Sequence, residues 1–240
     1  MKKVFISAPD LEDDGRALLE DNGLAPADNI GEAEAVLYQG SLEELFCKYS
    51  KNINASAIIP LNTFLMNNSL DPIDLSDQKS LGKLSFDQEN IRGVSDKIGE
   101  LIDSFTSRDH FADISRYMKM NGIELAQNAL IYKRLAGIKG EVSLEIFETK
   151  MFYNICATDS FGALSAGEVL SKLIRASVEK TYEEKESGAG LGLFMAINAS
   201  DFAIFRLKKG KQTQVCCIIN KYKRLKQYKS KSPALFIFKE

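Results

Sequence analysis

The chain has 240 residues, a formal net charge of −2 at pH 7 and 45% hydrophobic residues, a composition typical of a folded protein with one large or two small domains. This near balance of charge argues against a dedicated nucleic-acid-binding protein, because such proteins are usually strongly basic. No window approaches about 18 uninterrupted apolar residues, and the apolar run after Lys2 and Lys3 is too short for a signal peptide. The sequence therefore predicts a cytoplasmic protein without a membrane span.

The four cysteines show neither CxxC nor Cys/His spacing, and the chain has a single histidine. A structural zinc site is therefore not expected. Sparse cysteines of this kind are typical of reduced thiols in a cytosolic protein. We accordingly expect free thiols at Cys47, Cys156, Cys216 and Cys217.

Residues 1–85 are predicted to form a small α/β module. Short apolar strands are expected at 4–8, 35–39, 57–61 and, as the last of them, 81–84. Amphipathic helices are expected at 11–22 and 41–49. Strands that alternate with helices favour a parallel sheet covered on both faces.

This module resembles the flavodoxin-like receiver domain of response regulators. An acidic cluster follows the first strand, at Asp10, Asp13 and Asp14, and Lys83 resembles the family's strand-ending lysine. Where a receiver has its phosphorylated aspartate this chain has Gln39, an amide that cannot form an acyl phosphate, and the segment 23–35 is too short for a strand and a full helix. The resemblance thus implies a pseudo-receiver. The alternative is a generic α/β module with Asp13 and Asp14 in the first turn of a helix.

Residues 86–107 are predicted to form a linker helix that precedes a second domain at 108–240. Apolar residues at alternating spacings of three and four make a narrow seam: Ile91, Val94, Ile98, Leu101 and Phe105. Such a seam can pair two chains as a homodimer through residues 88–105, or pack against the first domain. Only about two heptads are present, which favours packing against the first domain.

A glycine-rich loop at 188–193 runs directly into an apolar helical segment. Gly188, Gly190 and Gly192 lack a Cβ, so backbone N–H groups can approach a ligand closely. A helix that begins near Gly192 would point the positive end of its dipole at the same place. The loop favours phosphate binding, although short glycine runs are also ordinary turns.

Three further segments carry polar residues that suit the same ligand. Glu124 and Asn128 share a helix face, which either points into a site or forms an exposed polar stripe. Asp159 ends a predicted strand before a turn at Gly162, where it can accept a hydrogen bond from an exocyclic amine. Thr213 lies near the turn of a β-hairpin predicted over 202–219.

In this order the four segments resemble the Bergerat-type (GHKL) ATPase fold of histidine kinases, DNA gyrase and anti-sigma-factor serine kinases. Glu124–Ala129 resembles the N box and Asp159–Gly162 the first glycine box. Gly188–Leu193 resembles the GxGLGL box, and Gly210–Val215 the terminal glycine-threonine box. The resemblance covers about residues 110–220 and implies an α+β sandwich, a mixed sheet with helices on one face.

The resemblance implies ATP and Mg²⁺ as cofactors. Glu124 would orient or deprotonate a nucleophile, and Asn128 would hold Mg²⁺ on the triphosphate. Asp159 and Thr213 would recognise adenine, with Gly162 in the turn beside the ring. The phosphates would be wrapped by Gly188, Gly190, Leu191 and Gly192. Lys133 would contact the nucleotide, since it is the cation nearest to Ile131, which stands where histidine kinases have Lys or Arg.

The implied function is a Mg-ATP-binding signalling protein that regulates a partner protein, by phosphorylation or by a nucleotide-dependent change of shape. Three departures from the family pattern weaken the expectation of catalysis more than that of nucleotide binding. They are Ile131, the longer turn of Asp159–Gly162 and a short lid at 163–186. The alternative is a non-catalytic adaptor. The basic run 221–231 either docks an acidic partner or nucleic acid or is a solvated stretch, and 234–238 is expected to return to the sheet.

Overall fold

A computed structural model describes residues 2–8, 12–49, 52–67, 69–86, 93–106, 112–137, 139–178, 191–222 and 232–239. Its strands are β1 (Lys3–Ser7), β2 (Ala25–Pro26), β3 (Ala35–Tyr38), β4 (Ala57–Pro60), β5 (Lys79–Phe86), β6 (Val142–Glu148), β7 (Phe152–Asp159), β8 (Phe202–Lys208), β9 (Gln212–Asn220) and β10 (Ala234–Lys239). Its helices are α1 (Glu12–Asp21), the 3₁₀ turn η2 (Ile30–Glu32), α2 (Leu42–Tyr49), α3 (Leu61–Asn67), α4 (Val94–Thr106), α5 (Ala112–Ala136), α6 (Ala166–Val178) and α7 (Leu191–Asn198).

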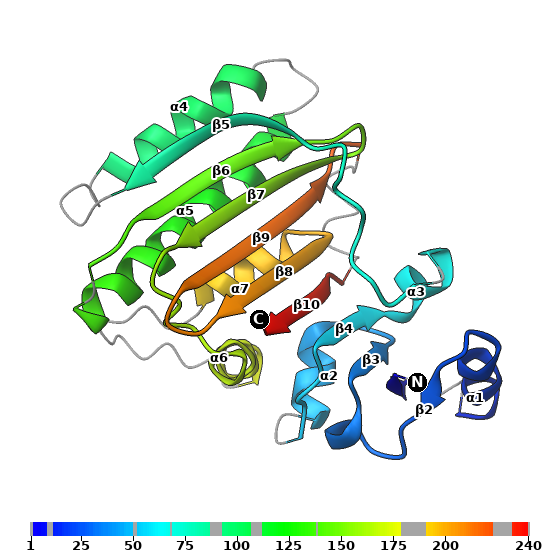
Figure 1. Cartoon of the computed structure of the whole chain (residues 1–240). Coiled ribbons are helices and arrows are strands. Elements are labelled where there is room, and N and C mark those ends of the chain that lie inside the picture. The colour runs from blue at the N-terminus through cyan, green and yellow to red at the C-terminus, as the bar shows by residue number, and fades with distance from the viewer. Residues whose placement is uncertain are drawn as a thin grey trace.

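The described strands form one mixed sheet in the order β2-β1-β3-β4-β10-β8-β9-β7-β6-β5 (Figure 1). The predicted α/β class is therefore confirmed. The N-terminal strands β2, β1, β3 and β4 are parallel, and the strands from β8 to β5 are antiparallel to one another. All residues of β3 and β4 are buried, as expected for parallel strands covered on both faces.

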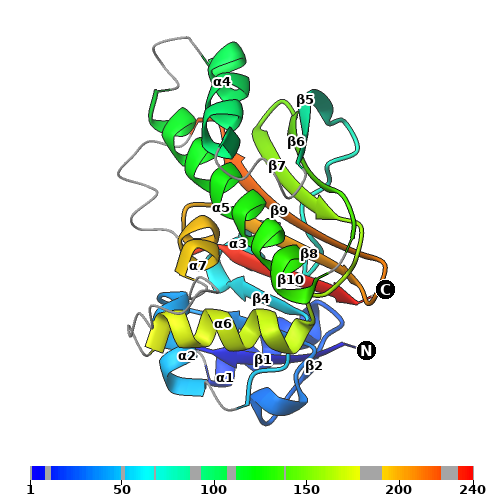
Figure 2. The same cartoon turned by 90° about the vertical axis from the view of Figure 1, so that its left-hand side faces the viewer.

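β10 joins the two halves of the sheet, because it pairs antiparallel with β4 and parallel with β8. The predicted final strand is thus confirmed. The Tyr38 hydroxyl at the end of β3 donates to the Pro233 carbonyl at 2.9 Å, just before β10 begins. Helix α2 also packs beside α6 (Figure 2). The N-terminal and C-terminal strands therefore share a sheet, rather than being connected only through a linker helix.

β5 lies at the opposite edge of the sheet from its predicted place. We expected 81–84 to end the N-terminal module, but β5 pairs antiparallel with β6, with Lys83 opposite Glu145. The likeness of Lys83 to a receiver lysine is therefore wrong. The polar residues of β5 suit an edge strand exposed on one face, whereas a strand beside β4 would be buried on both. As expected from its length, the segment 23–35 has no full helix: it holds the short strand β2 and the 3₁₀ turn η2.

Helices α4, α5 and α7 lie on one side of the strands from β5 to β9 (Figure 2). At Gly122 in α5 a Cβ would lie 3.0 Å from Ile98 Cγ2 and 3.3 Å from Leu144 Cδ2, so glycine allows the close approach of α4 and β6. Val94 and Ile98 of the predicted seam are buried, while Leu101 and Phe105 are partly buried against the same core. Ile91 lies outside the described residues, and Ile102, which the predicted seam did not include, is buried. The helix packs on α5 and β5 rather than on the N-terminal module. This seam is therefore occupied inside the chain, and the homodimer through 88–105 stays a prediction.

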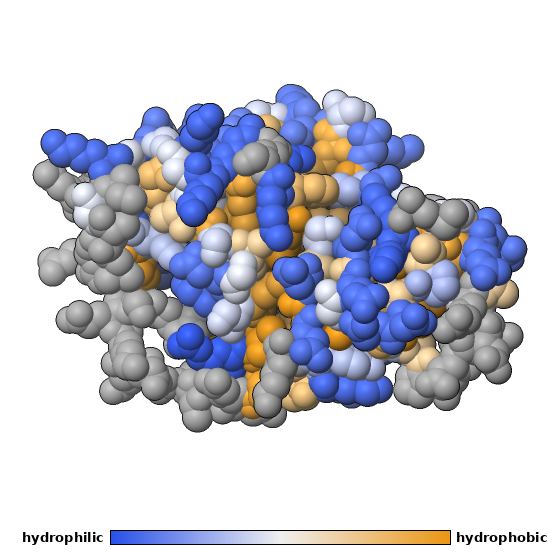
Figure 3. Space-filling model, turned by 60° about the horizontal axis from the view of Figure 1, so that its bottom comes forward, coloured by the Kyte–Doolittle hydropathy of each residue, from blue (hydrophilic) through white to orange (hydrophobic). Residues whose placement is uncertain are grey.

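A second core covers the other face of the sheet. Residues of α1 and α3 pack there, and Leu70, Ile73 and Leu75 of the connection to β5 belong to the same cluster. Viewed from the side on which α6 and α2 lie, hydrophobic residues gather in a band across the middle of the surface (Figure 3). None of the helices in the described ranges is long and apolar enough to cross a membrane.

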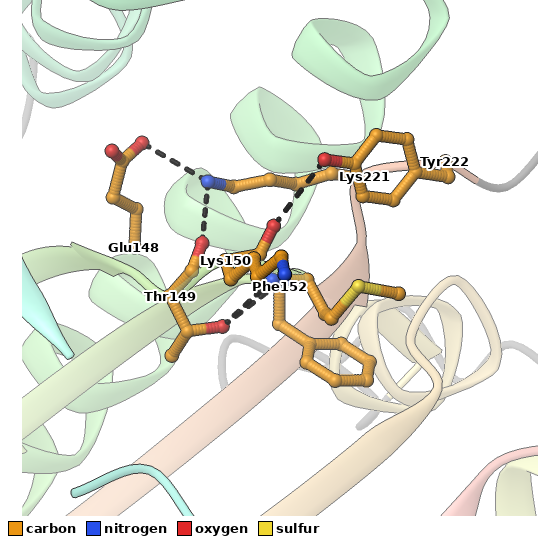
Figure 4. Close-up of polar contacts among 7 residues, drawn as sticks. Glu148, Thr149, Lys150, Phe152, Lys221 and Tyr222 are labelled. Atoms are coloured by element: carbon orange, nitrogen blue, oxygen red, sulfur yellow. Dashed lines mark hydrogen bonds and ion pairs between the residues drawn. The ribbon is translucent and has the colours of Figure 1, made fainter. Parts of the chain in front are cut away.

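Lys221, the first residue of the predicted basic run, closes the β6–β7 turn (Figure 4). Its ammonium donates to Glu148 Oε2 at 3.2 Å and to the Thr149 carbonyl at 2.6 Å, and lies 4.7 Å from the centroid of the Tyr153 ring. With 12% of its side chain exposed, Lys221 stabilises the turn rather than forming a docking patch. Residues 223–231 of that run lie outside the described residues, as does the single histidine of the chain, His110.

Cys156 and Cys216 face each other across β7 and β9 and form a disulfide, with a Cα–Cα distance of 4.1 Å. The prediction of free thiols is wrong for this pair, while Cys47 and Cys217 are free. The two cysteines are 60 residues apart in sequence, so their spacing gives no sign that they are cross-strand neighbours.

Replacing both members of this disulfide, as C156A/C216A, is expected to lower the free energy of unfolding by about 2–4 kcal/mol, the usual contribution of a native disulfide. Urea unfolding without reductant measures the loss, and C47A, at an exposed free thiol, is the control that should change little. A thiol titration of the unfolded wild-type protein that finds four reactive groups, instead of two, would contradict the disulfide.

Candidate functional site

A small cavity lies on the helix-covered face of the sheet, enclosed by α5, α6 and α7. It measures about 30 Å³ and is lined by Leu125, Asn128, Ala129, Tyr132, Ala157, Asp159, Leu164, Lys172, Leu193, Thr213 and Val215. Three of these residues, Asn128, Asp159 and Thr213, are candidates from three separate sequence segments. The fold therefore brings these three predicted residues to one place, whereas the described candidates Glu124, Lys133, Gly162, Leu191 and Gly192 are not part of the lining.

Helix α5 supplies the first pair of candidates. The Asn128 amide nitrogen donates to the Glu124 carbonyl at 2.7 Å, which leaves its Oδ1 as the atom available to a ligand. Asn128 lines the cavity, so this face of α5 is not an exposed polar stripe. Glu124 is half-buried, and this burial raises the pKa of its carboxyl group.

The start of α7 lies against Glu124. A Cβ on Gly192 would overlap the Glu124 carboxylate, so only glycine leaves this carboxylate its present position. The helix begins at Leu191, close to the predicted start, and Leu193 reaches the cavity. Gly188 and Gly190 lie outside the described residues. Glu124 and the last glycine of the loop therefore meet beside the cavity.

Asp159 is the most firmly held of the candidates. Its Oδ1 accepts hydrogen bonds from the backbone N–H groups of Phe161 (3.1 Å), Gly162 (2.8 Å) and Thr213 (3.2 Å). Gly162 has a φ of +59°, and its carbonyl accepts from Gly210 N at 3.0 Å. Asp159 thus ties its own loop to the β8–β9 hairpin. Its second oxygen accepts no hydrogen bond from the described residues and is available to a ligand.

Two hydroxyl groups of the cavity lining have no partner. Thr213 Oγ1 and the Tyr132 hydroxyl are buried and make no hydrogen bond within the described parts of the chain. Burial, and secondarily the nearby Glu168, raises the pKa of Tyr132 to about 12, so its hydroxyl stays protonated. Because buried polar groups are nearly always paired, such orphan groups indicate a ligand or bound water.

The cation of the cavity is not the predicted one. Lys133 is buried but does not line the cavity, whereas Lys172 does, with its Nζ 4.1 Å from the centroid of the Tyr132 ring. Sequence reasoning missed both Tyr132 and Lys172. Tyr132 lies four residues after Asn128 on the same helix face, which was a usable signal. Lys172 comes from α6 by tertiary packing, for which the sequence offers no sign.

Compared with protein-family models and with curated proteins, the chain matches none. What the cavity binds is therefore inferred from its own residues. In the described ranges no three His, Cys, Asp or Glu side chains group closely enough to hold a metal ion by themselves. A cation at Asn128 would consequently need most of its oxygen ligands from a bound molecule and from water.

Proposed function

We propose that the chain binds Mg-ATP in this cavity and uses it to regulate a partner protein, by phosphorylation or by a nucleotide-dependent change of shape. The observation that carries the proposal is the convergence of Asp159, Thr213 and Tyr132 on one cavity, with both hydroxyls unpaired within the described residues. Apart from Asn128 and Lys172, the other lining residues are apolar. A flat heterocycle with an exocyclic amine would satisfy them, because the free Asp159 oxygen accepts and the hydroxyls donate or accept.

The opposite end of the site suits the phosphates. Glu124 and Asn128 lie one turn apart on α5 beside the first turn of α7. Asn128 Oδ1 and phosphate oxygens would hold Mg²⁺, which prefers a few oxygen ligands and retained water. Glu124 would orient or deprotonate the nucleophile, since phosphoryl transfer depends mainly on positioning and charge neutralisation. This division of roles supports the histidine-kinase-like (GHKL) ATPase resemblance.

Helix α7 lines both the cavity and a second cleft, and so offers a route for regulation. Leu193 lines the cavity, while the next residue, Phe194, lines a separate cleft of about 900 Å³ at the carboxyl ends of β3 and β4. A ligand that moves α7 would therefore alter both surfaces. This cleft also contains Gln39, and the parallel order β2-β1-β3-β4 supports a pseudo-receiver whose amide cannot accept phosphate.

The second candidate function is a non-catalytic adaptor. Its support is the size of the cavity, about 30 Å³, against the roughly 300 Å³ or more of a usual ligand pocket. Ile131, which stands where histidine kinases have Lys or Arg, also favours the adaptor. The two candidates differ in whether nucleotide enters and turns over.

Calorimetric titration of Mg-ATP into wild type and Asp159→Asn tests the proposal. The substitution keeps the Oδ1 acceptor, and with it the backbone hydrogen bonds, but replaces the free acceptor by a donor that faces the amine. Wild type should bind, and the variant should bind at least about 10-fold more weakly, because an unpaired buried polar group costs about 1–3 kcal/mol.

Asp74→Asn is the matched control. Asp74 also accepts a backbone N–H in a turn, from Ser76 at 2.9 Å, but is exposed and distant in sequence from the cavity residues. Its variant should bind like wild type. Absence of binding to wild type at millimolar Mg-ATP would eliminate the ATP-dependent function and leave the adaptor.

A further inference from the structure

Lys172 has an unusual setting for a lysine. It is half-buried on α6, and no carboxylate lies within ion-pair distance of its Nζ in the part of the chain that the structure describes. Glu168, one turn earlier, is engaged with the backbone N–H and hydroxyl of Ser165 in a helix-capping arrangement. In the described part of the chain, the ammonium of Lys172 therefore lies over the face of the Tyr132 ring instead of in an ion pair.

This contact occupies a surface that a ligand would use. Tyr132 is the aromatic side chain among the residues that line the cavity, and stacking on such a ring is a common way to hold a flat heterocycle. With the ammonium 4.1 Å from the ring centroid, about 30 Å³ of the cavity is open, too little for a purine. A long, flexible side chain is the part of the wall that can move at least cost.

Burial lowers the pKa of Lys172, because desolvation disfavours the charged ammonium. Arg175, the next turn along α6, adds to this effect and Glu168 opposes it. An ammonium displaced from the aromatic ring consequently needs an anionic partner. In the described part of the chain no carboxylate lies within ion-pair distance of Lys172 Nζ, and a phosphate of a bound ligand would supply such a partner.

We propose that Lys172 exchanges partners when nucleotide binds, leaving the Tyr132 ring to the base and pairing with a phosphate of the same molecule. The inference rests on the proposed function and deepens it: the site takes phosphorylated purine nucleotides in preference to nucleosides. Lys172 then replaces the cation that Ile131 and Lys133 do not provide.

Titrations of ATP and adenosine into wild type and Lys172→Met test the exchange. The variant keeps the length of the side chain and removes its charge. ATP affinity should fall about 10-fold to 100-fold, as for loss of a charged hydrogen bond, while adenosine should bind at least as tightly as to wild type. Lys172→Arg should retain most of the preference for ATP.

Lys150→Met is the charge-matched control, since Lys150 is exposed in the β6–β7 turn at the other end of β7 from Asp159. It should leave both affinities unchanged, and thermal unfolding should confirm that every variant is folded. An equal loss of ATP and adenosine affinity in Lys172→Met, or no loss of either, would overturn the exchange while the ATP site stands. A wild-type protein that binds neither ligand would overturn the proposed function and the exchange together.

Discussion

Gly162→Ala is expected to cost about 2–5 kcal/mol of unfolding free energy and to abolish nucleotide binding. Part of the loss, about 1–2 kcal/mol, comes from placing a Cβ at a φ of +59°. The larger part comes from overlap, because the new Cβ would collide with the backbone of the β8–β9 hairpin: the Lys208 carbonyl and the Lys211 and Gln212 nitrogens. Backbone atoms in a paired hairpin cannot move aside independently, and overpacking of this kind typically costs about 1–3 kcal/mol.

The functional part of this result follows from Asp159. Its Oδ1 accepts from the N–H groups of both Gly162 and Thr213, so a displaced Gly162 would separate the two segments of the proposed base-binding end. Urea unfolding measures the stability change, and calorimetry at a temperature where the variant is folded measures binding.

Gly137→Ala is the matched control for Gly162→Ala. Gly137 also has a positive φ, +62°, but a Cβ there would meet nothing within 4 Å. Its substitution should therefore cost only about 1 kcal/mol, the conformational part of the penalty. If the two alanine variants lose the same stability, the close contact between the Asp159 loop and the hairpin is not what requires glycine at 162.

The sequence predicted which segments become strands far better than which strands pair. β3, β4 and β10 were recognised because their buried apolar runs have few other places in a fold. β5 was assigned to the wrong end of the sheet, since pairing with β6, more than 50 residues later, depends on long-range contacts that no local pattern records. The Cys156–Cys216 disulfide was missed for the same reason.

For the site too, residues in local sequence patterns were predicted and residues brought in by long-range packing were not. Asn128, Asp159 and Thr213 were predicted because each lies in a local pattern with its own chemistry, and the cavity contains all three. Lys133 was chosen for its nearness in sequence to Asn128, yet helix geometry turns residues five apart to different faces, and Lys133 does not line the cavity. Lys172 is brought in by the packing of α6, which only the assembled fold reveals.

Glu124→Gln is expected to reduce ATP turnover about 10²-fold to 10⁴-fold, the usual contribution of a general base, while Mg-ATP binds within about threefold of wild type. The amide preserves the shape of the side chain beside Gly192 but can no longer accept a proton. Phosphate release from ATP measures turnover. A wild-type protein that binds ATP without turnover favours the adaptor, and a fully active variant removes Glu124 from the chemistry.

The pH dependence of stability tests the setting of Glu124 without any reference to activity. Burial raises the pKa of its carboxyl above the ordinary value of 4.5, so the folded protein holds this proton more tightly than the unfolded chain does. The stabilisation from this proton is fully present below pH 4.5 and is lost as pH rises through the folded-state pKa. Relative to Glu124→Gln, which does not titrate, wild type should therefore become less stable across that interval, as measured by urea unfolding at a series of pH values. Parallel stability profiles for the two proteins would mean that the carboxyl group is solvated as an ordinary surface acid, and that it lacks the raised pKa which suits a general base near neutral pH.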